Sequence, residues 1–294
     1  MNSNNIFKAK FKEFQNKSIK PTNTTRFIHA SDIHLGSYQY RNEYRSDDYI
    51  RAFQEILELS IKQKVDFIIL AGDVFTSLEM LPGKLTRLIN ILSDFKEFTN
   101  NSILIIAIEG NHDIRKFSRG IRFERRGQSW LKLLNSLGLI ILLDTYFENP
   151  SEGMIKSYDF ETKKGGKIQI KNVVIYGTCY SGEQPISFVS KLRKEIIKKT
   201  DLFNILIQHF GIEGQMENVP GIKLENIQHL RHRVDYLALG HFHKQFILED
   251  WIYNPGSSEA VCTMDTSYKR GIFLVEISKK LEKFEKKVKI IQLV

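Results

Sequence analysis

Short apolar runs, each followed by a polar turn, alternate with stretches of helical periodicity in the first half of the chain. The runs 27–30, 66–70 and 103–107 are almost continuously apolar, as expected for strands buried on both faces of a sheet. Between them, residues 47–64 and a segment opened by Pro82-Gly83 carry apolar side chains at helical spacing. The alternation predicts at least one βαβ unit within a layered α/β domain.

The second half is richer in strands. Further strands are expected at 139–143, 168–170, 173–177, 205–208 and 236–240, and further helices at 130–137 and 185–199. Gly165-Gly166, between lysine-rich flanks, predicts a hairpin turn. The Lys/Glu-rich run 279–289 predicts a solvated edge hairpin.

Composition narrows the class of protein. A chain of 294 residues with 42% apolar content suits one large domain, or a domain with an appendage. The net charge of +9 favours an anionic partner, nucleic acid ahead of a membrane surface. The two cysteines lack metal-ligand spacing, which is typical of a reducing compartment, and no apolar run approaches the roughly 18 residues of a membrane span. We therefore expect a cytoplasmic protein, nucleoid-associated in a prokaryote.

Residues 1–25 form a basic N-terminal extension without the apolar core of a secretory signal. We expect this extension to be mobile. The alternative is a short basic amphipathic helix, because Phe7, Phe11 and Phe14 share helical spacing among lysines.

Five polar turns share one design, in which an apolar strand is followed by metal-compatible side chains. They are Asp32-Ile33-His34, Gly72-Asp73, Gly110-Asn111-His112-Asp113, His209 and Gly240-His241-Phe242-His243. In Asp-x-His and His-x-His the two side chains leave an extended backbone on the same side, so both reach one cluster. A single fragment of this kind is usually a helix cap or a satisfied polar group, but five in succession predict a metal centre. His29, His229 and His232 lie outside these turns and are expected to be ordinary.

Carboxylate, amide and imidazole ligands without thiolates suit Mn²⁺, Fe²⁺ or Zn²⁺ rather than a structural zinc. Two ions need about eight protein contacts, which seven residues supply if Asp73 bridges. The seven are Asp32, His34, Asp73, Asn111, His209, His241 and His243. His112 remains and fits a general acid for the departing oxygen, and Asp113 is expected to orient its imidazole.

This series of motifs resembles the calcineurin-like metallophosphoesterase superfamily. Within it, Ser31–Gly36, Ala71–Phe75, Ile108–Asp113 and Asn254–Ser257 resemble the Mre-eleven/SbcD double-strand-break repair nucleases. The resemblance implies a four-layer α/β/β/α sandwich with two mixed sheets over residues 26–276, and two Mn²⁺ ions, with Fe, Mg or Zn as alternatives.

The resemblance also implies residue roles. One ion would be held by Asp32, His34, Asp73 and His243, the other by Asp73, Asn111, His209 and His241. His112 would lie over the scissile phosphate. Such nucleases cleave DNA in double-strand-break repair, as 3′-to-5′ exonucleases on duplex ends and as endonucleases on single strands. They work with a Rad-fifty/SbcC-type ABC ATPase and pair through helices that correspond here to 82–98 and 130–137.

Two departures from the family pattern matter. Thr76 stands where members often carry a second histidine, which puts the associated exonuclease activity in doubt. The chain ends at Val294, so residues 277–294 are expected to be an edge strand or tail, with the DNA-capping domain and ATPase-binding segment missing.

A basic stretch begins three residues after His112. It contains Arg115, Lys116, Arg119, Arg122, Arg125 and Arg126, interleaved with Phe117 and Phe123. We expect its cations to hold phosphates that flank the cut and its aromatic rings to stack on bases. The alternative is a solvated loop, or one with its phenylalanines packed beneath it.

Three functions remain open from the sequence. The first is a DNA nuclease, and the second is a phosphoesterase acting on small nucleotides or phosphoproteins. The third is a metal-free binding scaffold, which the complete ligand set disfavours.

Overall fold

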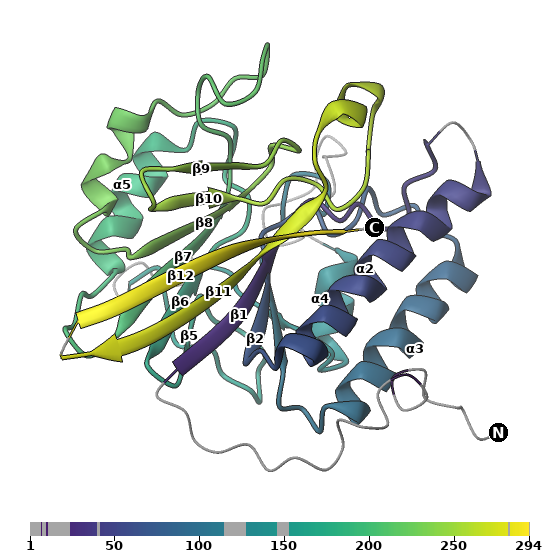
Figure 1. Cartoon of the computed structure of the whole chain (residues 1–294), viewed down its shortest axis with the longest axis horizontal. Helices are drawn as coiled ribbons and strands as arrows, with labels where there is room; N and C mark the ends of the chain where they lie inside the picture. The colour runs from purple at the N-terminus through teal and green to yellow at the C-terminus, as the bar shows by residue number, and fades with distance from the viewer. Residues whose placement is uncertain are drawn as a thin grey trace.

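Two six-stranded mixed sheets form the centre of the molecule (Figure 1). This computed structural model describes residues 7, 10, 24–39, 42–114, 128–145, 153–281 and 283–293. The first sheet has the order β12-β11-β1-β2-β3-β4, and the second has the order β5-β6-β7-β8-β10-β9. In each sheet a parallel core is bordered by antiparallel strands, β11 and β12 in the first and β5 and β9 in the second.

The strands are short where both faces are buried. The first sheet contains β1 (Thr24–Ala30), β2 (Phe67–Leu70), β3 (Leu104–Ala107), β4 (Ile141–Leu142), β11 (Gly271–Lys280) and β12 (Lys283–Gln292). The second contains β5 (Lys167–Ile170), β6 (Val173–Gly177), β7 (Phe203–His209), β8 (Tyr236–Gly240), β9 (Phe246–Leu248) and β10 (Ile252–Asn254). The helices are α2 (Glu43–Gln63), α3 (Pro82–Phe98), α4 (Trp130–Ser136) and α5 (Ile186–Glu195), with 3₁₀ turns η5 (Leu224–Asn226), η6 (Gln228–Leu230) and η7 (Thr263–Ser267).

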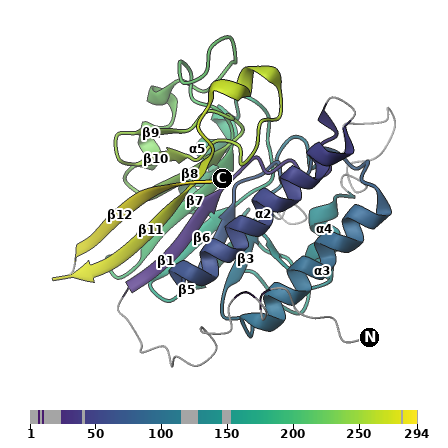
Figure 2. The same ribbon diagram turned by 45° about the vertical axis from the view of Figure 1, so that its right-hand side comes forward.

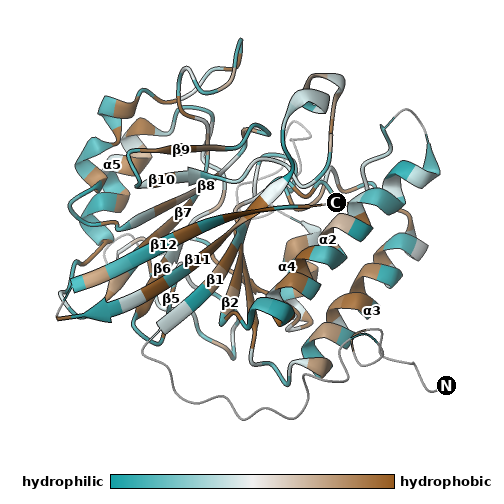
Figure 3. Ribbon diagram, viewed as in Figure 1, coloured by the Kyte–Doolittle hydropathy of each residue, from teal (hydrophilic) through white to brown (hydrophobic). Residues whose placement is uncertain are grey.

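Alternation along the strands sorts the core into three apolar layers. Phe67 and Ile69 of β2 point into the layer between the two sheets, where they join Ile205 and Ile207 of β7. Their neighbour Ile68 points outward, under α2, α3 and α4. On the far side, α5 packs on the outer face of the second sheet. Figure 2 shows α2 and α3 beside one sheet. In Figure 3 the inner strand β2 is brown, whereas the edge strand β12 is largely teal and α2, α3 and α5 carry both colours. The predicted four-layer α/β/β/α sandwich is confirmed.

Most predicted elements are present with shifted ends. Helix α2 begins at Glu43 rather than at residue 47, because the Asn42 side chain accepts a hydrogen bond from the Tyr44 amide and caps the helix. Helix α5 ends at Glu195, four residues before the predicted end. The edge hairpin predicted at 279–289 is confirmed, with β12 at the border of the first sheet.

The predicted turn at Gly165-Gly166 is wrong. The chain reverses between Asp159 and Lys164, where the Asp159 amide donates to the Lys164 carbonyl over 2.8 Å. The Asp159 carboxylate accepts from the Glu161 amide, which favours a turn at this position. Gly165 instead allows a close approach, because a Cβ there would lie 2.4 Å from the Tyr158 Cα.

Strand β1 begins at Thr24, inside the predicted extension 1–25. Ahead of β1 the structure describes Phe7 and Lys10, and both contact the domain. Phe7 is buried, with its ring 5.6 Å from that of Phe95 in α3. Lys10 forms an ion pair with Glu58 of α2. At Phe7 the extension is therefore packed rather than free. Over the described residues, no helix combines the length and apolarity needed to cross a membrane.

Candidate metal centre

The seven candidate ligands lie together at the carboxyl ends of strands from both sheets. Asp32 and His34 follow β1, Asp73 follows β2 and Asn111 follows β3, while His209 ends β7 and His241 and His243 follow β8. The carboxyl ends of parallel strands meet at one edge of a sheet. Because the two sheets pack against each other, their edges bring the side chains into one cluster.

The backbone at the ligands is unusual. Asp32, His34 and Asp73 have φ values of 51°, 52° and 48°, the left-handed conformation that non-glycine residues rarely adopt. The two turns hold each other in place, since the Asp32 amide donates to the Gly72 carbonyl and the His34 amide to the Asp73 carbonyl. Such strain persists where the surrounding structure imposes it, most often at functional sites.

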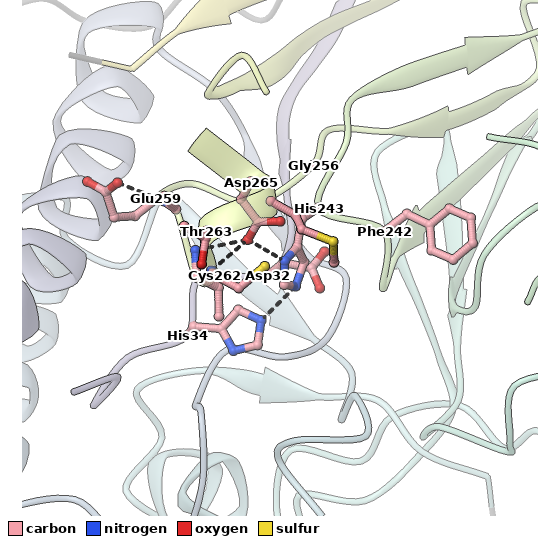
Figure 4. A network of polar contacts seen from close by, with 12 residues as sticks. Asp32, His34, Phe242, His243, Gly256, Glu259, Cys262, Thr263 and Asp265 are labelled. Atoms are coloured by element: carbon pink, nitrogen blue, oxygen red, sulfur yellow. Dashed lines mark hydrogen bonds and ion pairs between the residues drawn. The ribbon is translucent and has the colours of Figure 1, made fainter. Parts of the chain in front are cut away.

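One group of ligands consists of Asp32, His34 and His243, with ligand atoms within 4.8 Å of one another (Figure 4). The Nε2 atoms of His34 and His243 face each other at 3.2 Å. His34 Nδ1 is buried without a hydrogen-bond partner among the described residues. Two imidazole nitrogens converging beside a buried carboxylate fit a shared divalent cation. We call Asp32, His34 and His243 the first cluster.

The second group consists of Asp73, His209 and His241, with Asn111 beside them. The Asn111 Oδ1 lies 3.2 Å from His209 Nε2 and 3.0 Å from His241 Nδ1. The Asp73 Oδ2 lies 3.2 Å from His209 Nε2. These four residues, the second cluster, converge oxygen and nitrogen donors on one point and fit a second divalent ion.

Close packing fixes the ligand geometry. The Nδ1–H of His209 donates to the Ala71 carbonyl over 2.8 Å, which turns Nε2 toward the cluster. Gly72 leaves room for that ring, because a Cβ there would lie 2.4 Å from His209 Nδ1. A Cβ on Gly110 would lie 2.2 Å from the Asp73 Oδ1. Glycine is therefore required at both positions, because any side chain there would overlap with a ligand of the second cluster.

The electrostatics suit a cation. Burial lowers the pKa of His34 and of His241 to about 3, so both imidazoles are neutral and can offer a lone pair. Burial opposes the charged forms of Asp73 and His209, but their mutual attraction prevails. The attraction between the Asp73 carboxylate and the His209 imidazolium holds the pKa of Asp73 below its usual range and raises the pKa of His209 to about 9.

His112 lies at the exposed edge of the site. Its ring centroid is 5.0 Å from that of His34, and its amide donates to the Asp73 Oδ1 over 2.7 Å. Its Nδ1 lies 3.1 Å from the Thr76 carbonyl, which accepts a hydrogen bond from that nitrogen and leaves Nε2 for a substrate.

The expected role of Asp113 is wrong in this structure. Its carboxylate is buried and accepts hydrogen bonds from the backbone amides of Val74, Phe75 and Gly110. The side chain thus ties the turn after β2 to the turn after β3. The Thr76 carbonyl, rather than Asp113, orients His112.

Two neighbours of the cluster were not predicted from the sequence. Asp265, in η7, contacts His243 Nδ1 at 2.8 Å. Tyr180, after β6, has its ring centroid 6.0 Å from that of His209 and 6.1 Å from that of His241. Asp265 follows no apolar strand and so lacks the signal that marked the ligands.

The other candidates fall outside the cluster. His29 is buried against the Tyr236 hydroxyl and the Leu239 carbonyl, as an ordinary core residue. The basic stretch, with Arg115, Lys116, Arg119, Arg122, Arg125 and Arg126, lies outside the described residues.

The sequence of this chain is similar to a known family of phosphoesterases and to named proteins of other organisms. Residues 25–245 match the family model of the calcineurin-like phosphoesterases. The DNA double-strand break repair protein Mre11 of Archaeoglobus fulgidus is 29% identical over 238 residues, which cover 80% of this chain and 50% of that protein. The double-strand break repair protein MRE11 of Coprinopsis cinerea is 28% identical over 310 residues, covering 88% of this chain and 40% of that protein.

Among solved structures, a dimetal phosphatase from Danio rerio gives a TM-score of 0.46 at 10% identity, covering 91% of this chain and 98% of that one. The chain spans half or less of the length of the two curated relatives.

Proposed function

The chain belongs to the calcineurin-like phosphoesterase family and is a hydrolase with a dinuclear metal site, and from this premise we propose that it is a Mn²⁺-dependent DNA nuclease of double-strand-break repair. The observation that carries the proposal is the presence of two clusters of candidate ligands beside one exposed histidine. The relatives named as Mre11 and the net charge of +9 favour DNA as the substrate.

The two clusters divide the ligands. The first cluster, Asp32, His34 and His243, would hold one ion with Asp73, and the second cluster would hold the other. When bound, two divalent ions clamp a phosphoryl group and lower the pKa of a water molecule. Manganese is our choice among the metals that tolerate this mixture of oxygen and imidazole donors.

His112 would protonate the departing oxygen. The Thr76 carbonyl fixes Nδ1 as a donor, so Nε2 is the nitrogen that faces the substrate and carries the transferred proton. Asp113 contributes indirectly, because its hydrogen bonds to three backbone amides hold the turn that bears His112.

The balance between exonuclease and endonuclease activity rests on position 76. The Thr76 hydroxyl donates to the His34 carbonyl over 2.9 Å, so this side chain supports the ligand turn. We propose that the enzyme cuts single strands more readily than it degrades duplex ends.

We propose DNA as the first partner, and the basic stretch would bind it. We expect that replacing Arg115, Arg119 and Arg122 with alanine weakens DNA binding and flattens its dependence on salt, measured by fluorescence anisotropy. Unchanged binding would refute this role. A second copy of the chain and a Rad-fifty/SbcC-type ABC ATPase follow from the resemblance alone. A cytoplasmic or nucleoid location remains the expectation from the composition of the chain.

A second candidate function keeps the chemistry and changes the substrate to a small nucleotide or a phosphoprotein. The exposure of His112 favours it as well, since an open site accepts small esters. A metal-free scaffold is disfavoured, because all seven expected ligands lie in the two clusters.

One experiment separates these functions. Wild type and His112→Ala are given Mn²⁺ with blunt duplex DNA, circular single-stranded DNA and a small chromogenic phosphodiester. Cleavage of DNA that requires both Mn²⁺ and His112 supports the nuclease. Turnover of the small ester alone supports the second function, and no turnover of any substrate contradicts both. His232→Ala, at an exposed histidine outside the clusters, is the matched control.

A further inference from the structure

A buried carboxylate stands behind one of the two clusters. The Asp265 Oδ2 lies 2.8 Å from His243 Nδ1, on the side of the ring opposite to the Nε2 atom that faces His34 (Figure 4). The Asp265 side chain is fully buried. A buried carboxylate is costly unless its charge and lone pairs are matched, so its position calls for an explanation.

Asp265 is held in a fixed geometry. Its Oδ2 also accepts hydrogen bonds from the amides of Val261 and Cys262, each over 3.0 Å. Its backbone carbonyl accepts from Arg270, which brings a positive charge close by. The carboxylate therefore cannot follow a movement of the His243 ring, and the ring is held by the carboxylate instead.

The loop that carries Asp265 is anchored to the first sheet's helix layer. The Tyr49 hydroxyl of α2 donates to the Ala260 carbonyl over 2.7 Å, and Arg45 donates to the same carbonyl over 3.3 Å. Arg45 also pairs with Glu259 at 3.3 Å. Asp265 thus belongs to a rigid support rather than to a free loop.

The second cluster is supported differently. The ring of His209 is held through Nδ1 by the Ala71 backbone carbonyl, a neutral acceptor. A carboxylate partner makes a ligating imidazole a stronger donor to the metal than a carbonyl partner does, and it adds a negative charge behind the ion. The two metal positions therefore differ in the group that supports a ligating histidine, a carboxylate at the first cluster and a backbone carbonyl at the second.

We infer that Asp265 is a positioning residue that holds His243 Nε2 toward the ion of the first cluster and selectively strengthens that one metal position. The inference rests on the two-ion site of the proposed function. It adds a residue outside the ligand set and predicts that the two ions respond differently to its loss.

Two substitutions separate the roles of charge and of the hydrogen bond. Asp265→Asn keeps an acceptor oxygen where Oδ2 now lies and places the amide nitrogen at the Oδ1 position, which lacks a partner among the described residues. Asp265→Ala removes both charge and acceptor. We expect Mn²⁺ titration calorimetry to show one of two binding events weakened about 10- to 100-fold in these variants, more in the alanine variant, with the other event unchanged.

A spectroscopic signature tests occupancy independently of activity. At Mn²⁺ concentrations that fill both positions of the wild type, its electron paramagnetic resonance spectrum should be that of a spin-coupled pair. The spectrum of Asp265→Ala at the same concentration should be that of a single uncoupled ion. A general loosening of the fold would weaken both positions together and would not give this change.

Double variants identify the affected position. His241→Ala keeps the first cluster complete, and there Asp265→Asn should weaken the remaining event. His34→Ala keeps the second cluster complete, and there Asp265→Asn should have no effect. The matched control is Asp201→Asn, at an exposed aspartate that precedes the amino end of β7, whereas the ligand His209 lies at the carboxyl end of that strand.

The inference is overturned if Asp265→Asn and Asp265→Ala bind two ions as the wild type does, or if they weaken both events equally. Wild type that binds two ions but cleaves no DNA would contradict the proposed nuclease and leave this inference intact. Circular dichroism of each variant verifies the fold.

Discussion

At the scale of single residues, the metal centre depends on positions where a side chain has no room. Gly110 lies against Asp73, so that a Cβ would fall 2.2 Å from the carboxylate oxygen and 2.3 Å from the Asp73 amide nitrogen. The amide is backbone and cannot move away as a flexible side chain would. Adding one methyl group should therefore displace Asp73, the carboxylate of the second cluster.

We predict that Gly110→Ala abolishes tight Mn²⁺ binding, measured by calorimetry, and lowers the thermal unfolding midpoint. Gly83 provides the matched control, since it lies in the first turn of α3 with nothing within 4 Å of the position that a methyl group would occupy. There alanine should keep metal binding and stabilise the helix by about 0.5–1 kcal/mol. Normal Mn²⁺ affinity in Gly110→Ala would show that the turn at Gly110 can move to accommodate the methyl group.

His29 makes stability depend on pH without taking part in the site. Burial lowers the pKa of His29 to about 3, and the hydrogen bond to the Leu239 carbonyl opposes this shift only in part. An unfolded histidine titrates near 6.5, so between pH 6.5 and pH 3 the unfolded chain binds the extra proton. The stabilising contribution is full above pH 6.5 and is lost as the pH falls.

We predict that His29→Gln flattens the acid side of the stability profile. The wild-type slope includes up to about 1.4 kcal/mol per pH unit from this one proton, and glutamine removes it. Urea denaturation at pH 7, 6, 5 and 4 in the presence of EDTA measures the slope. Equal slopes for the two proteins would mean that His29 is protonated in the folded state.

The sequence predicts the candidate metal ligands better than it predicts the residues that hold those ligands in place. Asp32 and Asp73 are recognisable because each follows an apolar run that has to be a buried strand. Asp265 lies in the short 3₁₀ turn η7, which follows no apolar strand, and only the folded chain brings it to His243. Asp113 is adjacent to His112 in sequence, but its carboxylate turns away to three backbone amides, which no local pattern reveals.

At the scale of elements, helix α2 covers the first sheet with one apolar face. Phe53 is 2% exposed and lies on this buried face with Ile50 and Ile56. Tyr44, in the first turn of the same helix, is 80% exposed. Substitutions at Phe53 and at Tyr44 therefore test whether packing against the sheet or helix propensity stabilises α2.

We predict that Phe53→Ala lowers the free energy of unfolding by about 3–5 kcal/mol, because it opens a cavity between helix and sheet. Tyr44→Ala should change it by about 0.5 kcal/mol or less. Chemical denaturation of both variants measures the difference. Similar small effects at both positions would contradict the burial of this helix face.

Elements were predictable where burial dictates the pattern. Strands β2, β3 and β8 are apolar throughout because both faces are covered, and their ends were found within a residue or two. The reversal between Asp159 and Lys164 was missed, because the Asp159 side chain sets the turn while the glycines serve a backbone contact. A pair of glycines in the sequence can mark either a turn or a place where two backbone segments come close together.

At the scale of the whole molecule, the metal centre joins the two sheets. Asp32, Asp73 and Asn111 come from the first sheet, whereas His209 and His241 come from the second. Each cluster contains ligands from both sheets. Bound ions should therefore act as cross-links between the halves of the sandwich and stabilise the folded state as well as serve the reaction.

We predict that Mn²⁺ raises the thermal unfolding midpoint by several degrees and that EDTA reverses the rise. A ligand at 100 times its dissociation constant stabilises the folded state by about 2.7 kcal/mol per site. Asp73→Ala should lose most of the shift, because Asp73 serves the cluster that ties β2 to β7 and β8. His112→Ala should retain it in full, since His112 contacts the Thr76 carbonyl and lies outside both clusters. Differential scanning calorimetry with and without Mn²⁺ distinguishes the two variants, and a shift lost equally in both would place His112 among the ligands.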